Sequence, residues 1–184
     1  GPVVHAADAG EVSGPAKILE GYGKTQWGQT SEQVIEPVGA MDRQEESEHR
    51  VNCYKKEKEG PITETRYEFI DDQLHRVKVT YELPDRPETG QDTEGLEIIT
   101  EIVKKKYAGN DEIKGMLGAA RIYIRVDAGN DGRIYITYEN AKAAIAATKA
   151  IEERKRLEQL EAARERQRSP RYKKIQDLYL GEDI

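Results

Sequence analysis

The residues of this sequence that could supply a nucleophile and a base are Cys53, His49 and His75. A catalytic cysteine needs a neighbouring base or a positive environment that lowers its pKa. Cys53 stands in Val-Asn-Cys-Tyr, without a glycine-rich elbow or another recognised nucleophile setting. We therefore interpret Cys53 as a packed thiol and predict that the chain is not an enzyme. The many acidic residues leave an unrecognised catalytic acid pair open.

Two places resemble parts of metal sites. His49 and Cys53 would share one face of an extended strand, but a zinc site needs a third ligand that no neighbour supplies. The segment 127–132 begins like a calcium loop, yet the twelfth position holds Tyr138 where a bidentate glutamate is required. We interpret this segment as a hairpin turn, and we expect no metal and no cofactor.

Tyrosine and arginine side chains gather on the outward face of an expected hairpin. One strand carries Arg121, Tyr123 and Arg125, and these lie opposite Arg133, Tyr135 and Thr137 on the other. Tyrosine and arginine together are typical of binding hot spots, so we predict a protein-binding face. Two alternatives stay open, a solvated or helix-covered face and a stacking platform for single-stranded nucleic acid.

The strongest helix pattern covers residues 141–168, which are rich in alanine, glutamate, lysine and arginine and contain no glycine or proline. Its second half offers only Leu157 and Leu160 amid charged residues. After Ser169-Pro170 a short amphipathic segment carries Tyr172, Ile175, Leu178 and Tyr179. We predict that Leu157, Leu160, Tyr172 and Tyr179 bind a protein partner or mediate self-association.

Composition limits the function classes. The 184 residues are 36% hydrophobic and 35% charged, with a net charge of −6. Residues 141–184 carry 11 basic against 8 acidic residues, net +3, and residues 1–140 carry 18 against 27, net −9. An acidic body disfavours a general nucleic-acid binder. One cysteine allows no intrachain disulfide, and no stretch has the roughly 18 apolar residues of a transmembrane helix.

The amino terminus predicts export. Gly1-Pro2 is typical of a protease-tag scar, and the apolar stretch from Val3 to Ala9 ends in Ala-x-Ala, like a secretory signal cut near Ala9. We therefore expect a periplasmic or secreted bacterial protein. Residues 1–20 show little periodicity, so we expect a mobile lead-in and structure from Gly21.

The hydrophobic periodicity predicts an α+β fold with helices packed on one face of an antiparallel sheet. We expect a short strand ending at Trp27, a helix capped by Thr30 or Ser31, and a loop or frayed edge at 42–48. The remaining expected elements are a hairpin at 65–69 and 77–81, a helix at 93–107, and a second hairpin at 122–126 and 134–138. The body at 21–140 is then followed by a long charged helix at 141–168 and a tail at 169–184.

One strand sequence occurs twice. Val-Lys-Val-Thr-Tyr-Glu at 77–82 returns as Ile-Tyr-Ile-Thr-Tyr-Glu at 134–139. Two explanations stay open: chance similarity of amphipathic strands, and two related helix-hairpin units at about 21–90 and 91–140.

The segment 27–34, Trp-Gly-Gln-Thr-Ser-Glu-Gln-Val, followed by Tyr67-Glu68-Phe69 and the strand at 74–81, resembles the opening of small exported bacterial proteins with a W-G-x-[ST]-x-x-x-V helix start. The layout is also similar to BamE-like and β-lactamase-inhibitor-protein-like folds. The resemblance covers residues 21–140, lacks the lipidated cysteine of lipoprotein members and excludes the arm after Ala141. It implies envelope assembly or protein binding and identifies no ligand residues.

From these patterns we expect an exported, non-catalytic protein-interaction or scaffold module of a bacterial cell envelope. The alternative is an accessory domain that binds a small molecule or glycan through the tyrosine and arginine face. An enzyme using Cys53 or an acid pair is the third hypothesis.

Overall fold

The computed structural model describes residues 14–180, in which the chain forms two compact units with their boundary between Ala147 and Thr148. The stretch from Val3 to Ala9 lies outside the described residues, so export stays a prediction. Within residues 14–180, no helix combines the length and the apolar character needed to cross a membrane.

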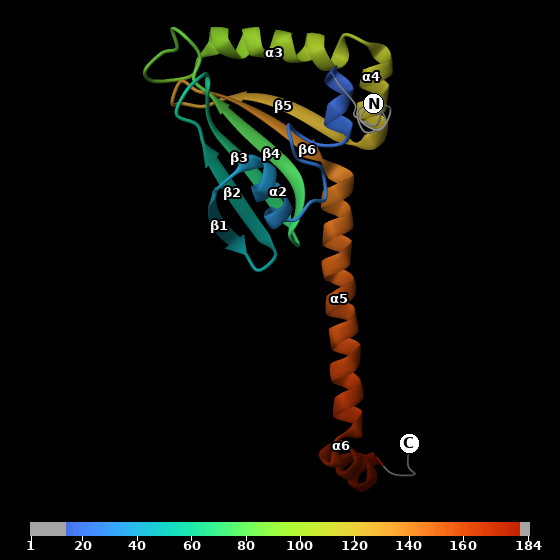
Figure 1. Cartoon of the computed structure of the whole chain (residues 1–184). Helices are drawn as coiled ribbons and strands as arrows, with labels where there is room; N and C mark the ends of the chain where they lie inside the picture. Colours follow the sequence, from blue (N-terminus) through green and yellow to red (C-terminus); the bar gives the residue numbers. More distant parts are fainter. Residues whose placement is uncertain (1–13, 181–184) are drawn as a thin grey trace, which may run out of the picture. The chain divides into compact units, whose positions relative to one another are not determined.

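The first unit contains one antiparallel sheet of six strands in the order β1-β2-β3-β4-β6-β5 (Figure 1). The strands are β1 Asp42–Ser47, β2 Arg50–Lys56, β3 Ile62–Ile70, β4 Gln73–Tyr81, β5 Ile122–Ala128 and β6 Ile134–Asn140. Together with the helices this sheet confirms the predicted α+β fold.

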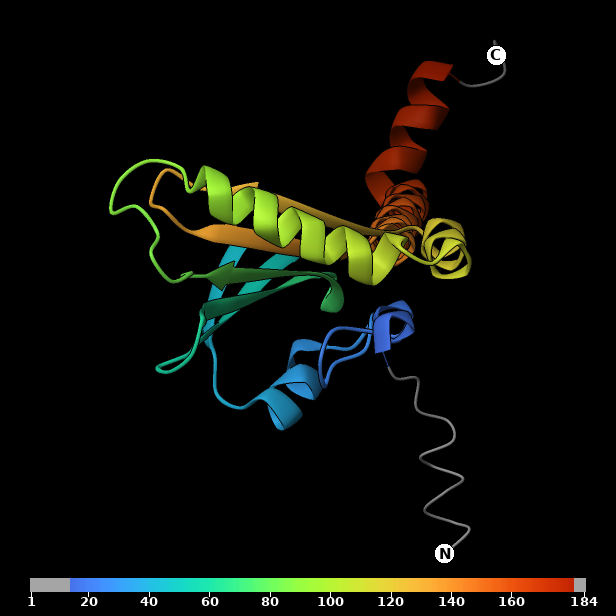
Figure 2. The same cartoon turned by 90° about the horizontal axis from the view of Figure 1, so that it is seen from above.

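Helices cover the apolar face of the sheet. They are η1 Gly14–Leu19, α2 Ser31–Val38, α3 Thr93–Ala108 and α4 Asp111–Ala120. Figure 2 shows α3 leading into α4, and η1 packs against α4. Ile18, Val34 and Leu117 from three of these helices join strand residues such as Phe69 and Val77 in one core cluster. Alternate residues of each strand therefore point either into this core or to the opposite face of the sheet.

The chain is ordered earlier than the predicted start at Gly21, because η1 buries Ile18 in the core. The predicted strand ending at Trp27 is wrong, since residues 20–30 form turns. The Trp27 indole nitrogen donates a hydrogen bond to the Ile18 carbonyl at 2.8 Å. A half-buried indole needs such a partner, and this contact fastens the segment to η1.

Helix α2 begins as predicted. Thr30 accepts from the Gln33 backbone and Gln33 accepts from the Thr30 backbone, forming a capping box. The segment at 42–48, expected as a loop or frayed edge, is largely the exposed edge strand β1. An edge strand pairs through its backbone and needs no buried side chain, so its hydrophobic pattern was absent.

Helix α4 was not predicted from the sequence. Asn110 caps it by accepting from two backbone amides, and Leu117 is buried. Gly115 and Gly118 lie within it, and glycine lowers intrinsic helix propensity by about 1 kcal/mol. Packing against the core therefore outweighs the weak local preference.

The repeated strand sequences are β4 and β6, which lie side by side within the sheet. Val79 pairs with Ile136, the residue at the equivalent position of the repeat, so a local two-fold relates the two strands. Tyr138 packs on the core side against Tyr22 and Tyr107, with ring centroids 5.0 and 6.3 Å away. Any in-register antiparallel pair has such a local two-fold, so the duplication of two helix-hairpin units stays a prediction.

The predicted long helix is α5 Ala141–Arg168. Ser169 caps the next element, α6 Pro170–Ile175, which continues into the π-helical turn η2 Gln176–Leu180. The second unit therefore comprises most of α5, α6 and η2.

Candidate functional site

The face of the sheet opposite the helix-packed core, here called the polar face, carries almost only polar side chains. They come from the strand positions between the core residues. Three rows cross the sheet from β2 through β3, β4 and β6 to β5: Asn52-Glu68-Arg76-Glu139-Tyr123, Tyr54-Arg66-Lys78-Thr137-Arg125 and Lys56-Glu64-Thr80-Tyr135-Asp127.

The first row contains a compensated charge cluster. Glu68, only 7% exposed, accepts a hydrogen bond from Arg76 at 3.1 Å, and its other carboxylate oxygen lies 3.4 Å from Nε of Arg66. A second nitrogen of Arg76 contacts Glu139 at 3.3 Å. Alternating charges on neighbouring strands therefore stabilise one another across β3, β4 and β6.

Lys78 lies at the centre of the second row and contacts an aromatic ring rather than a carboxylate. Its Nζ is 4.5 Å from the centroid of the Tyr135 ring, a cation–π geometry. Over the described residues, no carboxylate is within ion-pair distance of this half-buried ammonium. Burial, followed by the nearby charge of Arg66, lowers the pKa of Lys78, although the more distant charges of Glu68 and Asp127 oppose this shift.

The neighbours of Lys78 in its row are also donors. Arg66 lies on β3, Thr137 on β6 and Arg125 on β5. Arg125 is exposed and contacts Asp127 at 2.8 Å, so part of its charge is already compensated. Arg66 is likewise close to Glu68 and Thr137 is only 5% exposed, so Lys78 is the cation of this row with the most charge left for an incoming anion.

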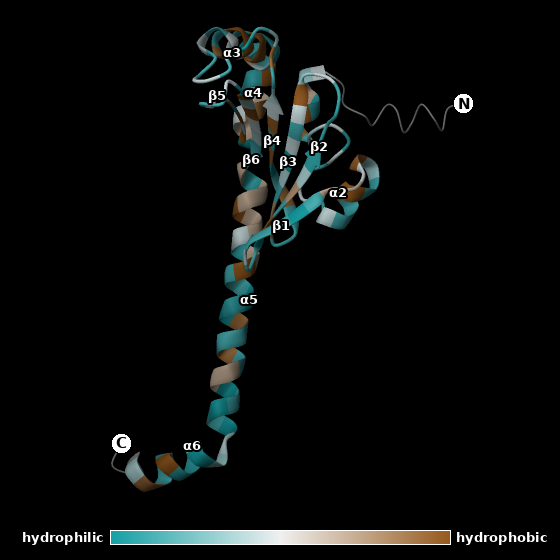
Figure 3. Cartoon of the chain, turned by 90° about the vertical axis from the view of Figure 1, so that its left-hand side faces the viewer, coloured by the Kyte–Doolittle hydropathy of each residue, from teal (hydrophilic) through white to brown (hydrophobic). Residues whose placement is uncertain are grey.

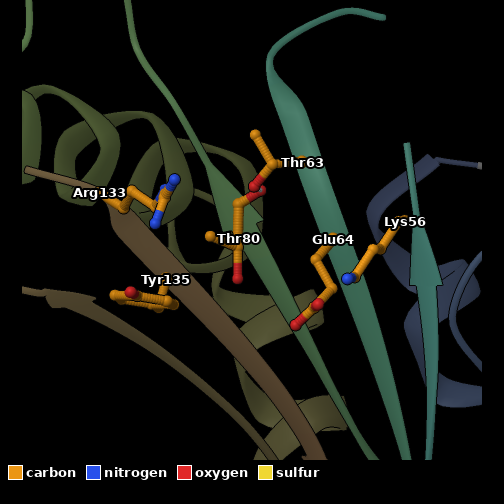
Figure 4. A pocket seen from close by; sticks show the side chains of 6 residues that line it. All are labelled: Lys56, Thr63, Glu64, Thr80, Arg133 and Tyr135. Atoms are coloured by element: carbon orange, nitrogen blue, oxygen red, sulfur yellow. Dashed lines mark hydrogen bonds between the residues drawn. The ribbon is translucent and has the colours of Figure 1, made fainter. Parts of the chain in front are cut away.

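A hollow of about 290 Å³ lies over the third row, next to the row that contains Lys78 (Figure 4). Its lining residues come from four strands and from the turn before β6: Lys56, Thr63, Glu64, Thr80, Arg133 and Tyr135. The Tyr135 hydroxyl donates to Asp131 at 2.6 Å. Burial and this bond to Asp131 raise the pKa of Tyr135 to about 12.

The structure unites only some of the predicted face residues. Tyr123, Arg125 and Tyr135 share the polar face, but Tyr123 is opposite Glu139 and Tyr135 is opposite Asp127. The two tyrosines are therefore in different rows and do not pair across the hairpin.

The two flanking arginines of the predicted site lie outside the strands. Arg121 ends α4 in the left-handed conformation, with φ 55°. Arg133 lies in the turn before β6 and contacts Glu82 at 2.7 Å and Asp131 at 3.3 Å. The prediction that these two arginines lie on the paired strands is wrong, because β5 begins at Ile122 and β6 at Ile134, and Arg133 already has two acidic partners.

Sequence reasoning missed Lys78, Arg66 and Tyr54 as members of the same surface. Their alternation with core residues was visible in the sequence, but the pairing of β4 with β6 was not. That pairing brings Lys78 beside Tyr135.

The predicted residues of the second unit are exposed. Leu157 and Leu160, three positions apart on α5, line a hollow of about 350 Å³ together with Glu161, Arg164 and Arg168. Tyr172 lies on α6 and Tyr179 on η2, and both rings are exposed.

The catalytic candidates are differently placed. Cys53 is fully buried in β2, and burial raises the pKa of its thiol. His49 lies in the turn before β2, where Nε2 is 3.7 Å from a Glu48 oxygen. In the part of the chain between residues 14 and 180, no three histidine, cysteine or acidic side chains group as a metal site would require.

Comparison with known proteins found no match: no family model, no curated protein and no solved structure matches this chain. The resemblance to BamE-like and β-lactamase-inhibitor-protein-like layouts therefore stays a prediction. Function has to be inferred from the residues of the polar face and of the second unit.

Proposed function

We propose that this chain is a non-catalytic protein-binding module whose polar face receives a partner with an exposed carboxylate. The observation that carries this proposal is Lys78, a half-buried ammonium in a row that crosses five strands, with no carboxylate of the described residues at ion-pair distance. A partner's aspartate or glutamate would supply the missing counter-charge.

The favourable free energy of binding would come from pairing a carboxylate with the Lys78 ammonium, which is already partly dehydrated. The folded chain has already lost part of the hydration of Lys78, as its lowered pKa indicates. An incoming carboxylate therefore meets a cation whose desolvation is partly complete, and the surrounding face excludes water further. Charge pairs that are desolvated at an interface can have coupling energies of about 1.5 kcal/mol or more.

The surroundings suit a protein partner. Tyr54 at one end of the row and Tyr123 in the adjacent row offer aromatic contact area, and Tyr123 is 55% exposed. Tyrosine loses little conformational entropy relative to the contact area it buries, and tyrosine and arginine both recur at binding hot spots. Glu68 and Glu139 are already paired with arginines, so they offer little to a basic partner.

Site-specific photo-crosslinking in a bacterial envelope extract tests the proposal. A benzophenone side chain at Tyr123 should give a discrete adduct with a partner, and Lys78→Gln should remove that adduct because the counter-charge is lost. The matched control is Lys104→Gln, which removes an exposed lysine of α3.

The adduct should persist in the control variant. Adducts that are unchanged by Lys78→Gln, or that form equally from a benzophenone at Ile102 of α3, would contradict the proposal. Circular dichroism of each variant establishes that the fold is retained.

A second candidate function is the binding of a small polar ligand such as a monosaccharide. The hollow of about 290 Å³ beside Tyr135 favours it, because its lining offers hydroxyl, ammonium and carboxylate groups together. Ligand pockets usually measure about 300–1,000 Å³, so this hollow of about 290 Å³ is just below that range. NMR titration with monosaccharides distinguishes the two functions. Only ligand binding in the hollow would give saturable amide shifts centred on Thr80 and Tyr135.

A further inference from the structure

The end of the second unit is basic and carries exposed apolar side chains. Between Arg164 and Ile175 the sequence has six basic residues and one acidic residue, net +5. The basic residues are Arg164, Arg166, Arg168, Arg171, Lys173 and Lys174. This segment differs in sign from residues 1–140, whose net charge is −9.

The apolar side chains of α6 and η2 are unusually accessible. Tyr172 and Ile175 are 38% and 43% exposed, and Leu178 and Tyr179 are 66% and 77% exposed. Figure 3 shows hydrophobic positions next to hydrophilic ones along α6. The short stretch from Tyr172 to Tyr179 therefore presents two aromatic and two aliphatic side chains beside Lys173 and Lys174.

Ser169 and Pro170 fix where this segment begins. The Ser169 hydroxyl accepts from the Tyr172 backbone amide at 3.1 Å, and Pro170 occupies the first helical position. Ile175 then follows Tyr172 by three positions and Tyr179 follows Ile175 by four, the spacing of neighbours on one helix side. The local sequence thus specifies a new helix with an apolar side after the end of α5.

We infer that the segment from Arg164 to Leu180 binds the surface of an anionic lipid bilayer. A bilayer interface accommodates both features together, because anionic headgroups attract lysine and arginine while the acyl boundary accepts leucine, isoleucine and tyrosine. This inference concerns the second unit and does not depend on the function proposed for the polar face.

Other anionic partners fit less of the segment. A nucleic-acid backbone would neutralise the six basic residues but would leave Ile175 and Leu178 exposed to water. A second copy packed in parallel could cover Leu157 and Leu160 but would bring the like-charged basic segments together, and an antiparallel copy would face them toward the start of α5, where the charged residues are Lys142 and Lys149. A lipid surface is the occupant that uses both the charge and the apolar side chains.

Salt limits the repulsion between the acidic residues of 1–140 and an anionic surface. At about 0.15 M salt, charges separated by more than about 8 Å are largely screened. Attraction at the surface therefore depends on the charges that touch it.

Co-sedimentation of the full chain with vesicles tests the inference. We expect binding to phosphatidylcholine vesicles that contain phosphatidylglycerol, and much weaker binding to pure phosphatidylcholine. Each basic residue near an anionic surface strengthens binding about fivefold, so Lys173→Gln/Lys174→Gln should weaken it about 30-fold. Tyr179→Ser should weaken it about tenfold, because the ring no longer enters the interface.

Matched changes in the first unit serve as controls. Lys104→Gln/Lys105→Gln removes two exposed lysines of α3, and Ile102→Ser removes an exposed apolar side chain of the same helix. Both should leave vesicle binding unchanged.

Absence of binding to the anionic vesicles would overturn the inference, as would equal losses in the α3 controls. Binding to an acidic peptide or to single-stranded DNA without binding to vesicles would assign the segment to a different partner and would also overturn it.

Discussion

His75 is a buried titratable side chain of β4, only 2% exposed. Burial, then the charges of Arg76 and Arg50, lower its pKa from 6.5 to about 4. The unfolded chain therefore binds this proton at higher pH than the folded chain. The stability that neutral His75 provides is complete above about pH 6.5 and is lost as the pH falls toward about 4.

Unfolding in urea at several pH values measures this effect. The pKa difference corresponds to about 3 kcal/mol of unfolding free energy, lost mainly between about pH 6.5 and about pH 4. His75→Gln should flatten the decline over that window by a similar amount, whatever its effect at pH 7. An unchanged pH dependence in this variant would show that His75 is not neutral in the fold.

Glu68 offers a second test at the residue scale. Glu68→Ala leaves Arg66 and Arg76 close together without their shared counter-charge, so we expect a loss of about 2–3 kcal/mol in unfolding free energy. Asp127→Ala on the same face removes a carboxylate from an exposed pair and should cost less than about 1 kcal/mol. Equal losses in both variants, measured by urea unfolding, would contradict the central role of Glu68.

Sequence reasoning reached some of these residues and not others. The alternation of polar and apolar residues in β3 and β4 indicates which side chains lie outside the core, among them Arg66 and Lys78. The partners of those side chains depend on the order of the strands in the sheet. β4 and β6 are neighbours in the sheet, although α3, α4 and β5 separate them along the chain. A local pattern contains no such information.

At the scale of elements, local capping specifies α2. The Thr30 side chain accepts the Gln33 amide hydrogen bond at 3.2 Å. Thr30→Ala should therefore lower the unfolding free energy by about 1 kcal/mol. Thr93→Ala is the matched control, because Thr93 is inside α3 and Asp92 caps that helix. The prediction fails if thermal denaturation shows the same shift for both variants.

The elements that sequence predicted well have strong local signals. The helix at 93–107, the long helix at 141–168 and both hairpins are confirmed because their periodicity and turn residues agree with the fold. The edge strand β1 and the glycine-containing α4 lack such signals. They form because pairing with β2 and burial of Leu117 stabilise them.

At the scale of the whole molecule, the two units carry different chemistry. The first presents Lys78 on a sheet face, and the second presents a basic segment with exposed apolar residues. The two proposed activities are thus separable: changes at Lys78 concern the partner, and changes at Lys173 and Lys174 concern the lipid surface.

The most direct test of the central claim is isothermal titration calorimetry of the crosslinked partner, once purified, with the intact chain and with Lys78→Gln. We predict at least about a tenfold loss of affinity in the variant, because a desolvated charge pair is worth about 1.5 kcal/mol or more. Lys104→Gln should bind as the unaltered chain does. Equal affinity of the Lys78→Gln variant and the unaltered chain would contradict the claim that the polar face binds its partner through Lys78.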